Sequence, residues 1–278
     1  MEFIDQHNQL YSDGKSSFSL GINQFADKSI SEIRRLNGLI VSKSVQSASK
    51  IYTDNDVESL PAEIDWTTKG VVAPIKNQGN CGSCWAFSAV GSMESAHAIA
   101  TGHLVELSEQ ELVDCSDSEG DYGCDGGWMD NGFKFAIDHG IDTEKSYPYD
   151  GFDGTCDSAE LNKTIGATFH GYVDIKQYDE NALQSACAKN GPISVGIDAS
   201  SQYFSFYKSG VYDHDDCSTT MLDHGVVVVG YGTSSSGKQY WKVRNSWGTS
   251  WGMKGYILMS RNKHNQCGIA TKASYPIV

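Results

Sequence analysis

A cysteine at the start of an apolar helical stretch is the residue of this sequence best placed to do chemistry. Cys84 stands within the run Gln78 to Ser88, which reads QGNCGSCWAFS. A thiol is a good nucleophile only as the thiolate, so a reactive cysteine needs surroundings that lower its pKa. The positive end of a helix dipole and the free N–H groups of a first helical turn provide such surroundings. Cys84 is therefore a candidate nucleophile.

Histidine and asparagine residues far along the chain complete a possible catalytic set. Taken alone, a cysteine in an apolar helix more often belongs to the core or to a disulfide. Likewise, His224 beside the run 226–229 could be a buried structural histidine, and Asn245 could be a turn residue. Their joint pattern favours catalysis, because both follow the Cys-Gly-Ser-Cys-Trp sequence that contains Cys84 at a characteristic wide separation. The sequence resembles in this respect the papain family, in which the His and Asn follow the nucleophile by roughly 130–150 positions; His224 falls within that window and Asn245 slightly beyond it.

Five separated runs, in one order, make the chain resemble the cathepsin L-type proteases of the papain family. The runs are 78–88, 107–115, 123–127, 222–225 and 245–248. The resemblance implies that Cys84 attacks the scissile carbonyl, that His224 holds it as a thiolate–imidazolium pair and later protonates the leaving amine, and that Asn245 orients the imidazole. It also implies an oxyanion hole made by the Gln78 side chain and the Cys84 N–H, with Trp247 over the Asn–His contact.

The pattern of elements predicts an α+β protein. Helices are expected over 84–101 and 129–139 and from residue 109 onward, and β-rich runs lie at 226–229, 240–243 and 256–259. Ser83 and Ser108 are the expected N-caps, the latter in a capping box, while Gly102 and Gly140 are the expected stops. The resemblance implies a papain-like fold of two lobes, a helical left lobe and a β-barrel-like right lobe, with the site in the cleft between them.

The chain divides near residue 60, because all eight cysteines and all six tryptophans lie beyond it. Residues 1–59 are predicted to be an accessory segment and residues 60–278 the peptidase domain. The sequence Gly-Ile-Asn-Gln-Phe-Ala-Asp at 21–27 resembles the propeptide motif Gly-x-Asn-x-Phe-x-Asp of these proteases, and Ile4 and Asn8 match the end of a longer helical motif.

The resemblance implies that the chain begins inside an inhibitory propeptide. Residues 38–59 are then expected to run along the cleft, opposite to the direction of substrate, and to cover Cys84. Cleavage near Ser59 and Leu60 would release the mature enzyme, with Asp27 as the candidate acid sensor. The alternative is that these residues form a disordered tail.

The cysteine spacing is irregular and does not form two Cys-x-x-Cys knuckles, so it favours disulfides and an oxidising route of maturation over a zinc site. The resemblance implies the pairs Cys81–Cys124, Cys115–Cys156 and Cys217–Cys267. It leaves Cys84 reactive and Cys187 unpaired on a buried helix face. Neither a metal nor another cofactor is expected.

The net charge and several short sequence signals limit the possible location and partners of the protein. A net charge of −14 argues against nucleic acid as a ligand. The sequence has no apolar run of about 20 residues to span a membrane and no apolar signal core at its start. Asn162 lies in a glycosylation sequon. We expect a monomer, lysosomal or secreted, whose signal peptide is absent from this chain. Its expected partners are peptide and protein substrates, its own prosegment and cystatin-type inhibitors.

The family's main selectivity pocket receives the side chain two residues before the cleaved bond. Its matching positions here are Trp128, Met129, Gly196, Leu222 and Lys272, and Gly126 and Gly127 are expected to pair with the substrate main chain. Apolar and small residues at most of these positions predict a preference for a hydrophobic side chain. Lys272 departs from the small residue often found at the pocket floor, and we expect it to reach toward water while admitting some acidic side chains.

Two functions of other classes are possible on the same fold. One is a templating homologue of the silicatein kind, which carries serine at the nucleophile position; the other is a catalytically dead binding protein. Cys84 argues against the first, and the intact set of Cys84, His224, Asn245 and Gln78 argues against the second. The sequence has no insertion resembling the occluding loop of the family's exopeptidases, so an endopeptidase is predicted.

Overall fold

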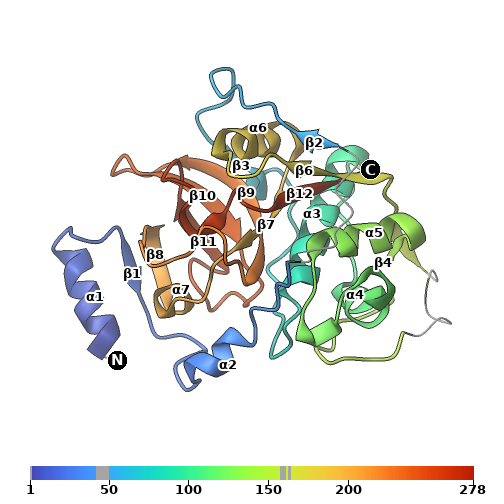
Figure 1. The fold of residues 1–278 in the computed structure, drawn as a ribbon, viewed down its shortest axis with the longest axis horizontal. Coiled ribbons are helices and arrows are strands. Elements are labelled where there is room, and N and C mark those ends of the chain that lie inside the picture. Colours follow the sequence, from blue (N-terminus) through green and yellow to red (C-terminus); the bar gives the residue numbers. More distant parts are fainter. Residues whose placement is uncertain (1, 42–49, 157–160, 162–163) are drawn as a thin grey trace.

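The computed structural model describes residues 2–41, 50–156, 161 and 164–278. Figure 1 shows the three helices of residues 84–139 gathered on one side of the molecule and a large sheet on the other, with the N-terminal helix at the outer edge of the sheet side. The helices are α1 (Glu2–Ser12), α2 (Ile30–Arg34), α3 (Cys84–Thr101), α4 (Glu109–Cys115), α5 (Met129–His139), α6 (Glu180–Asn190) and α7 (Gln202–Ser205). Short 3-10 turns are η1 (Trp66–Thr68), η2 (Ser116–Glu119), η3 (Gly123–Asp125) and η4 (Gln266–Gly268).

The described residues form a ten-stranded sheet whose two edge strands both belong to the early segment, residues 1–59. Its order is β1 (Phe18–Leu20), β8 (Tyr207–Tyr212), β11 (Tyr256–Ser260), β10 (Gln239–Arg244), β9 (His224–Thr233), β7 (Ile193–Ile197), β12 (Ala273–Ile277), β6 (Gly171–Ile175) and β2 (Ile51–Tyr52), and β3 (Ile64–Asp65) pairs with β9. The pairs β8–β11 and β2–β6 are parallel and the other pairs are antiparallel. A separate pair is β4 (Ile141–Asp142) and β5 (Ile165–Ala167).

Helix α3 is the central helix, packed against α5 on one side and β9 on the other. Its side chains are buried along most of its length, which fits its apolar sequence. Residue 91 is glycine and leaves room for the Arg244 side chain: a Cβ there would lie 2.7 Å from its guanidinium. Gly102 ends the helix in the left-handed conformation, as predicted.

Two hydrophobic cores underlie the two sides of the molecule. One joins the sheet to α6 and α7, and the other joins α3, α4 and α5. From the early segment, the first core includes Phe18, Leu20, Phe25, Ile33 and Leu36, and the second includes Leu39. The early segment is therefore packed into both cores. The predicted α+β architecture, with a helical and a β-rich side, is confirmed.

The predicted helices and β runs lie where expected, but two capping predictions need correction. Ser83 occupies the N-cap position of α3 without capping it, because its hydroxyl bonds to the Tyr149 hydroxyl at 2.7 Å. Ser108 caps α4 by accepting from the Glu111 N–H at 3.0 Å. The return half of the capping box is not made, because Ser108 and Glu111 both bond to the backbone of Asp142 instead. Among the described residues no helix is long and apolar enough to cross a membrane.

Candidate active site

Cys84 is the first residue of α3, and its side chain is fully buried. The turn that precedes it is fixed by the Cys81–Cys124 disulfide, with a Cα–Cα distance of 4.7 Å, and by a hydrogen bond from the Gly82 N–H to the Cys124 carbonyl at 3.0 Å. The thiol therefore lies at the positive end of a long helix, held by a rigid turn.

His224 and Asn245 meet because they lie at the same end of neighbouring strands. His224 begins β9, and Asn245 directly follows β10. His224 Nε2 lies 2.8 Å from Asn245 Oδ1, which also accepts the Ser246 N–H at 2.8 Å. An amide oxygen can only accept, so Nε2 carries the proton and Nδ1 is the basic nitrogen. The Trp247 ring lies 4.8 Å from the His224 ring, as predicted for a residue covering this contact.

Burial holds the candidate pair in neutral form. It raises the pKa of the Cys84 thiol to about 12 and lowers the pKa of His224 to about 4. The Cys84 sulfur accepts the Gly225 N–H at 3.4 Å, and His224 Nδ1 has no hydrogen-bond partner within the described part of the chain. The thiolate–imidazolium pair therefore stays a prediction for the uncovered site.

The Gln78 amide faces a carbonyl of the early segment. Its Nε2 donates to the carbonyls of Leu36 and Cys81, both at 2.8 Å. The Ser246 hydroxyl donates to its Oε1 at 2.7 Å and so fixes which way the amide points. A peptide carbonyl thus already accepts from the group predicted to bind the oxyanion. Sequence reasoning did not identify Leu36 as the residue that supplies it, because no motif marks that position.

Residues 37–40 lie across the site, held by main-chain hydrogen bonds around one isolated β-bridge. Leu39 forms a parallel bridge with Gly127: the Gly127 N–H donates to Gly38 and the Ile40 N–H to Gly127, both at 2.9 Å. The Leu39 N–H donates to the Asp223 carbonyl at 3.0 Å. Main-chain pairing at Gly127, predicted for substrate, is thus made by this segment. Of the segment 38–59 that was predicted to run along the cleft, residues 42–49 lie outside the described residues.

Close contact at this point depends on glycine. A Cβ on Gly38 would lie only 1.7 Å from the carbonyl oxygen of Gly82, in the turn before Cys84. A Cβ on Gly126 would lie 2.7 Å from the carbonyl oxygen of Gly38. The segment thus lies directly on the turn that positions the thiol.

Leu39 fills part of the predicted selectivity pocket. Its side chain is 6% exposed, and its Cδ2 lies 2.8 Å from the place a Cβ would take on Gly196, where Leu222 also lies within 3.1 Å. Leu39 and the predicted pocket residue Met129 belong to the same core.

The predicted pocket residues Trp128 and Lys272 line a cavity of about 370 Å³ together with Asp130. Asp130 was not recognised from the sequence. Its carboxylate accepts from the Trp128 indole at 2.8 Å and from the Ser274 hydroxyl, and burial raises its pKa to about 6. A carboxyl group thus lies in the same cavity as the lysine that the sequence singled out.

The early segment also docks on Trp247, through the motif at 21–27. Phe25 packs edge-on against the Trp247 ring with centroids 5.0 Å apart, and Gln24 donates to the Trp247 carbonyl at 2.7 Å. Asn23 donates to the Ser205 carbonyl at 2.9 Å. Asp27 is exposed, and within the described residues its side chain makes no hydrogen bond or ion pair, so its proposed acid-sensing role has no contact to support it.

All three predicted disulfides are present. The Cα–Cα distances are 4.7 Å for Cys81–Cys124, 4.8 Å for Cys115–Cys156 and 4.8 Å for Cys217–Cys267. Cys84 and Cys187 are free and buried. Cys187 lies in α6, as predicted. Asn162, the predicted glycosylation site, lies outside the described residues, and no group of three or more metal-ligating side chains is assembled among those described.

Comparison with known proteins agrees with this geometry. The family model "Papain family cysteine protease" matches residues 60–277. Cathepsin L1 of Drosophila melanogaster is 51% identical over 99% of this chain and 76% of its own length, and procathepsin L of Mus musculus is 46% identical over 100% and 83%.

Solved structures of related precursors match the chain along its length. Digestive procathepsin L2 proteinase from Tenebrio molitor larval midgut has a TM-score of 0.94 at 39% identity, covering 100% of this chain and 89% of its own. The recombinant stem bromelain precursor has a TM-score of 0.87 at 38% identity, with the same coverage. The similarity therefore includes residues 1–59 as well as the body of the chain, and the predicted papain-like two-lobe fold is confirmed.

Proposed function

The chain belongs to the papain family as a cathepsin L-like cysteine protease, and we propose that it is an endopeptidase zymogen in which residues 1–59 inhibit the peptidase domain 60–278. The observation that carries the proposal is the meeting of three buried groups under the early segment. The Cys84 thiol at a helix start accepts from the N–H of the residue after His224, His224 pairs with Asn245, and the Gln78 amide, bonded to Ser246, faces a peptide carbonyl.

The proposed reaction uses each of these groups in turn. Once the cleft is open to water, Cys84 transfers its proton to Nδ1 of His224, and the thiolate attacks the scissile carbonyl. The oxyanion is stabilised by the Gln78 amide and the Cys84 N–H. His224 then protonates the leaving amine, and water hydrolyses the resulting thioester. Asn245 keeps the imidazole in the tautomer that this sequence of steps requires.

Inhibition follows from the way residues 36–40 occupy the site. The Leu36 carbonyl accepts a hydrogen bond from the Gln78 amide, and the Leu39 side chain fills the pocket at Gly196. The parallel pairing at Gly127 supports the inference that this segment runs opposite to substrate. A segment bound in this direction blocks the cleft without presenting a correctly oriented bond to Cys84.

Leucine in the pocket also supports a preference for a hydrophobic side chain two residues before the cleaved bond. Leu39 is the side chain that the protein itself places against Gly196 and Leu222. Lys272 adds a weaker tolerance of acidic side chains at the same subsite, because its ammonium group can reach one in partly exposed surroundings.

The three disulfides favour maturation in an oxidising compartment. We therefore propose a lysosomal or secreted monomeric enzyme. Its substrates are proteins and peptides, and inhibitors of the cystatin type are proposed to enter the same cleft.

Thiol labelling combined with a peptide assay tests the proposal. The acid-activated protein is treated with iodoacetamide, its labelled peptides are mapped by mass, and turnover of a peptide with leucine at the selective position is measured. We expect one label per molecule, on Cys84, and loss of turnover in proportion to it. Cys187→Ser serves as the matched control, since Cys187 is the other free and buried thiol.

Three outcomes would reject the protease function. They are the absence of label on Cys84, turnover that survives complete labelling, and unchanged turnover in Cys84→Ala. The first, together with absent turnover, would favour a binding or templating role for the fold, and the last two would show that the activity does not depend on Cys84.

A further inference from the structure

Two histidines lie on opposite sides of the contact between the early segment and the peptidase domain and share two aromatic neighbours, Phe18 and Tyr203. They belong to a histidine–aromatic cluster made of Phe3, His7, Phe18, Tyr203, Tyr212 and His214. Tyr203 contacts both imidazoles, with ring centroids 5.2 Å from His7 and 4.1 Å from His214. Phe18 lies 4.4 Å from His7 and 6.2 Å from His214. His7 and Phe18 thus come from one side of the contact, and Tyr203 and His214 from the other.

His7 lies on α1 and is 6% exposed. Its Nε2 donates to the Phe18 carbonyl at 2.9 Å, and the Ser16 hydroxyl lies 3.2 Å from the same nitrogen. Burial lowers the pKa of His7 more than the bond to Phe18 raises it, and His214 lowers it further. Of the described residues packed against His7, the titratable ones are Tyr203 and His214, so no facing carboxylate supports a charge on it.

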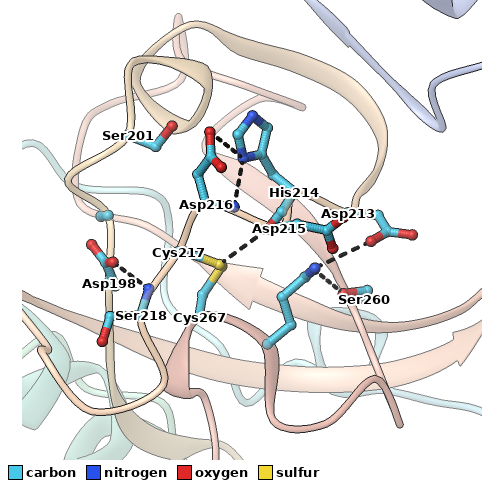
Figure 2. Close-up of a disulfide and its surroundings, with 12 residues drawn as sticks. Asp198, Ser201, Asp213, His214, Asp215, Asp216, Cys217, Ser218, Ser260 and Cys267 are labelled. Atoms are coloured by element: carbon cyan, nitrogen blue, oxygen red, sulfur yellow. Dashed lines mark hydrogen bonds and ion pairs between the residues drawn. A yellow bond between two sulfur atoms is a disulfide. The ribbon is translucent and has the colours of Figure 1, made fainter.

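His214 follows β8 and lies in the acidic loop drawn in Figure 2. Its Nδ1 accepts the Asp216 N–H at 3.2 Å and lies 3.9 Å from the Asp216 carboxylate. Burial lowers the pKa of His214, while Asp216, Asp215 and Asp213 act in the opposite direction. Their effect is limited, because the Asp216 side chain is 83% exposed and Asp213 is already paired with Lys263.

We propose that His7 and His214 form a two-histidine pH switch, which holds α1 and β1 on the peptidase domain at neutral pH and weakens that contact on acidification. The proposal rests on the proposed inhibitory role of residues 1–59 and adds the groups that sense acid. It replaces Asp27, which is exposed, with two histidines on opposite sides of the contact.

The direction follows from proton linkage. Both pKa values are lower in the docked form than the ordinary histidine value of about 6.5. At a pH above about 6.5 both imidazole rings are neutral in the docked and in the undocked form, so protonation does not weaken docking. As pH falls below this value, the undocked form binds protons that the docked form excludes, so docking weakens. Two like charges within one aromatic cluster then oppose re-docking.

Loosening at this cluster affects the neighbouring pairing. β1 is a short edge strand paired with β8, and Asn8 of α1 bonds to the Leu20 backbone in both directions. Release of α1 thus removes the support of β1. The next contact along the chain is the motif at 21–27, which docks on Trp247 beside the catalytic groups.

Hydrogen exchange on the full chain tests the switch. Cys84→Ala is used as the parent, to prevent self-cleavage, and the opening constant of amides in α1 and β1 is measured from pH 7 to pH 5 after correction for intrinsic exchange. The test variants are His7→Gln, His214→Gln and the double variant, which keep a neutral hydrogen-bonding side chain. The controls are His139→Gln, a histidine exposed on α5, and Asp27→Asn.

In the parent we expect the opening constant to rise about tenfold for each histidine whose docked pKa lies one unit below its free value. Each single variant should lose the part of that rise contributed by its own histidine, and the double variant should lose both parts. The two controls should keep the full rise. A double variant that keeps the parent's rise, variants that shift opening equally at every pH, or an Asp27→Asn variant that abolishes the rise would each overturn the proposal.

Hydrogen exchange measures the docking of α1 and β1 directly and does not depend on catalytic turnover. The switch can therefore fail while the proposed inhibition stands. If inhibition fails instead, the full chain with Cys84 intact is active at neutral pH although α1 stays protected.

Discussion

Residues 1–59 and residues 60–278 share two hydrophobic cores but are held in place by different means. The peptidase domain is cross-linked by three disulfides, whereas the early segment has no cysteine. Within the described residues the segment contributes six deeply buried apolar side chains, Phe18, Leu20, Phe25, Ile33, Leu36 and Leu39. Its strands β1 and β2 lie at the two edges of the sheet. The difference predicts that the segment, although firmly docked, can be removed without unfolding the domain.

The strongest test of this difference is to replace one buried phenylalanine by alanine in each of the two parts of the chain. Phe25→Ala removes the ring that packs on Trp247, and Phe133→Ala removes a fully buried ring of α5. Each truncation costs about 3–5 kcal/mol where it acts. We expect Phe25→Ala to speed iodoacetamide labelling of Cys84 in the full chain at neutral pH by roughly a hundredfold or more. Phe133→Ala should instead lower the free energy of unfolding of the processed domain.

Two measurements, one for each variant, test this prediction. Labelling is followed by mass, and unfolding of the processed domain by urea. If Phe25→Ala left the labelling rate unchanged, the segment would not depend on this contact.

The next effect concerns the glycine that lies on the turn before Cys84. In Gly38→Ala the added methyl meets the Gly82 carbonyl, which belongs to rigid backbone. Overpacking of this kind costs about 1–3 kcal/mol, so labelling of Cys84 in the full chain should accelerate about 5- to 150-fold. Gly21→Ala is the control, because there the methyl meets only the flexible Lys208 side chain. Equal rates in the two variants would argue against close contact at Gly38.

The smallest expected effect is on the preference for the side chain two residues before the cleaved bond. It concerns residues 60–278 alone. Lys272→Ala should lower turnover of a peptide with glutamate at the selective position, relative to one with leucine, by about 2- to 5-fold, because a partly exposed ion pair contributes little. The ratio of kcat/KM for the two peptides measures this in processed enzyme. An unchanged ratio would remove Lys272 from the selectivity proposal.

Local signals predicted much of the peptidase domain. The extent of α3, its stop at Gly102, the helix of residues 129–139 and the β-rich runs follow from hydrophobic period and glycine position. The disulfides and the positions of Cys84, His224 and Asn245 required the resemblance to a family. Ser83 was predicted to cap α3, but a tertiary partner, Tyr149, takes its hydroxyl.

Contacts of the early segment could not be predicted in the same way. The bond from Gln78 to Leu36 joins residues 42 positions apart, and the contact of His7 with Tyr203 spans a still longer separation. No local period or cap marks such partners. The sequence motif at 21–27 identified a propeptide but not its docking site on Trp247, and nothing in residues 36–40 marked Leu39 as the side chain that enters the pocket.

The pH dependence of Cys84 labelling, compared between the full chain and the processed enzyme, tests most directly whether a competent site is held covered. In the covered form the thiol pKa is raised to about 12 and the His224 pKa lowered to about 4, so the pair is neutral between those values. The account predicts that from neutral pH upward, where the early segment stays docked, the full chain labels slowly and its labelling rate rises only toward high pH. Processed enzyme should label rapidly from acidic pH upward, because the ion pair forms once the cleft is open. Identical profiles in the two forms would contradict it.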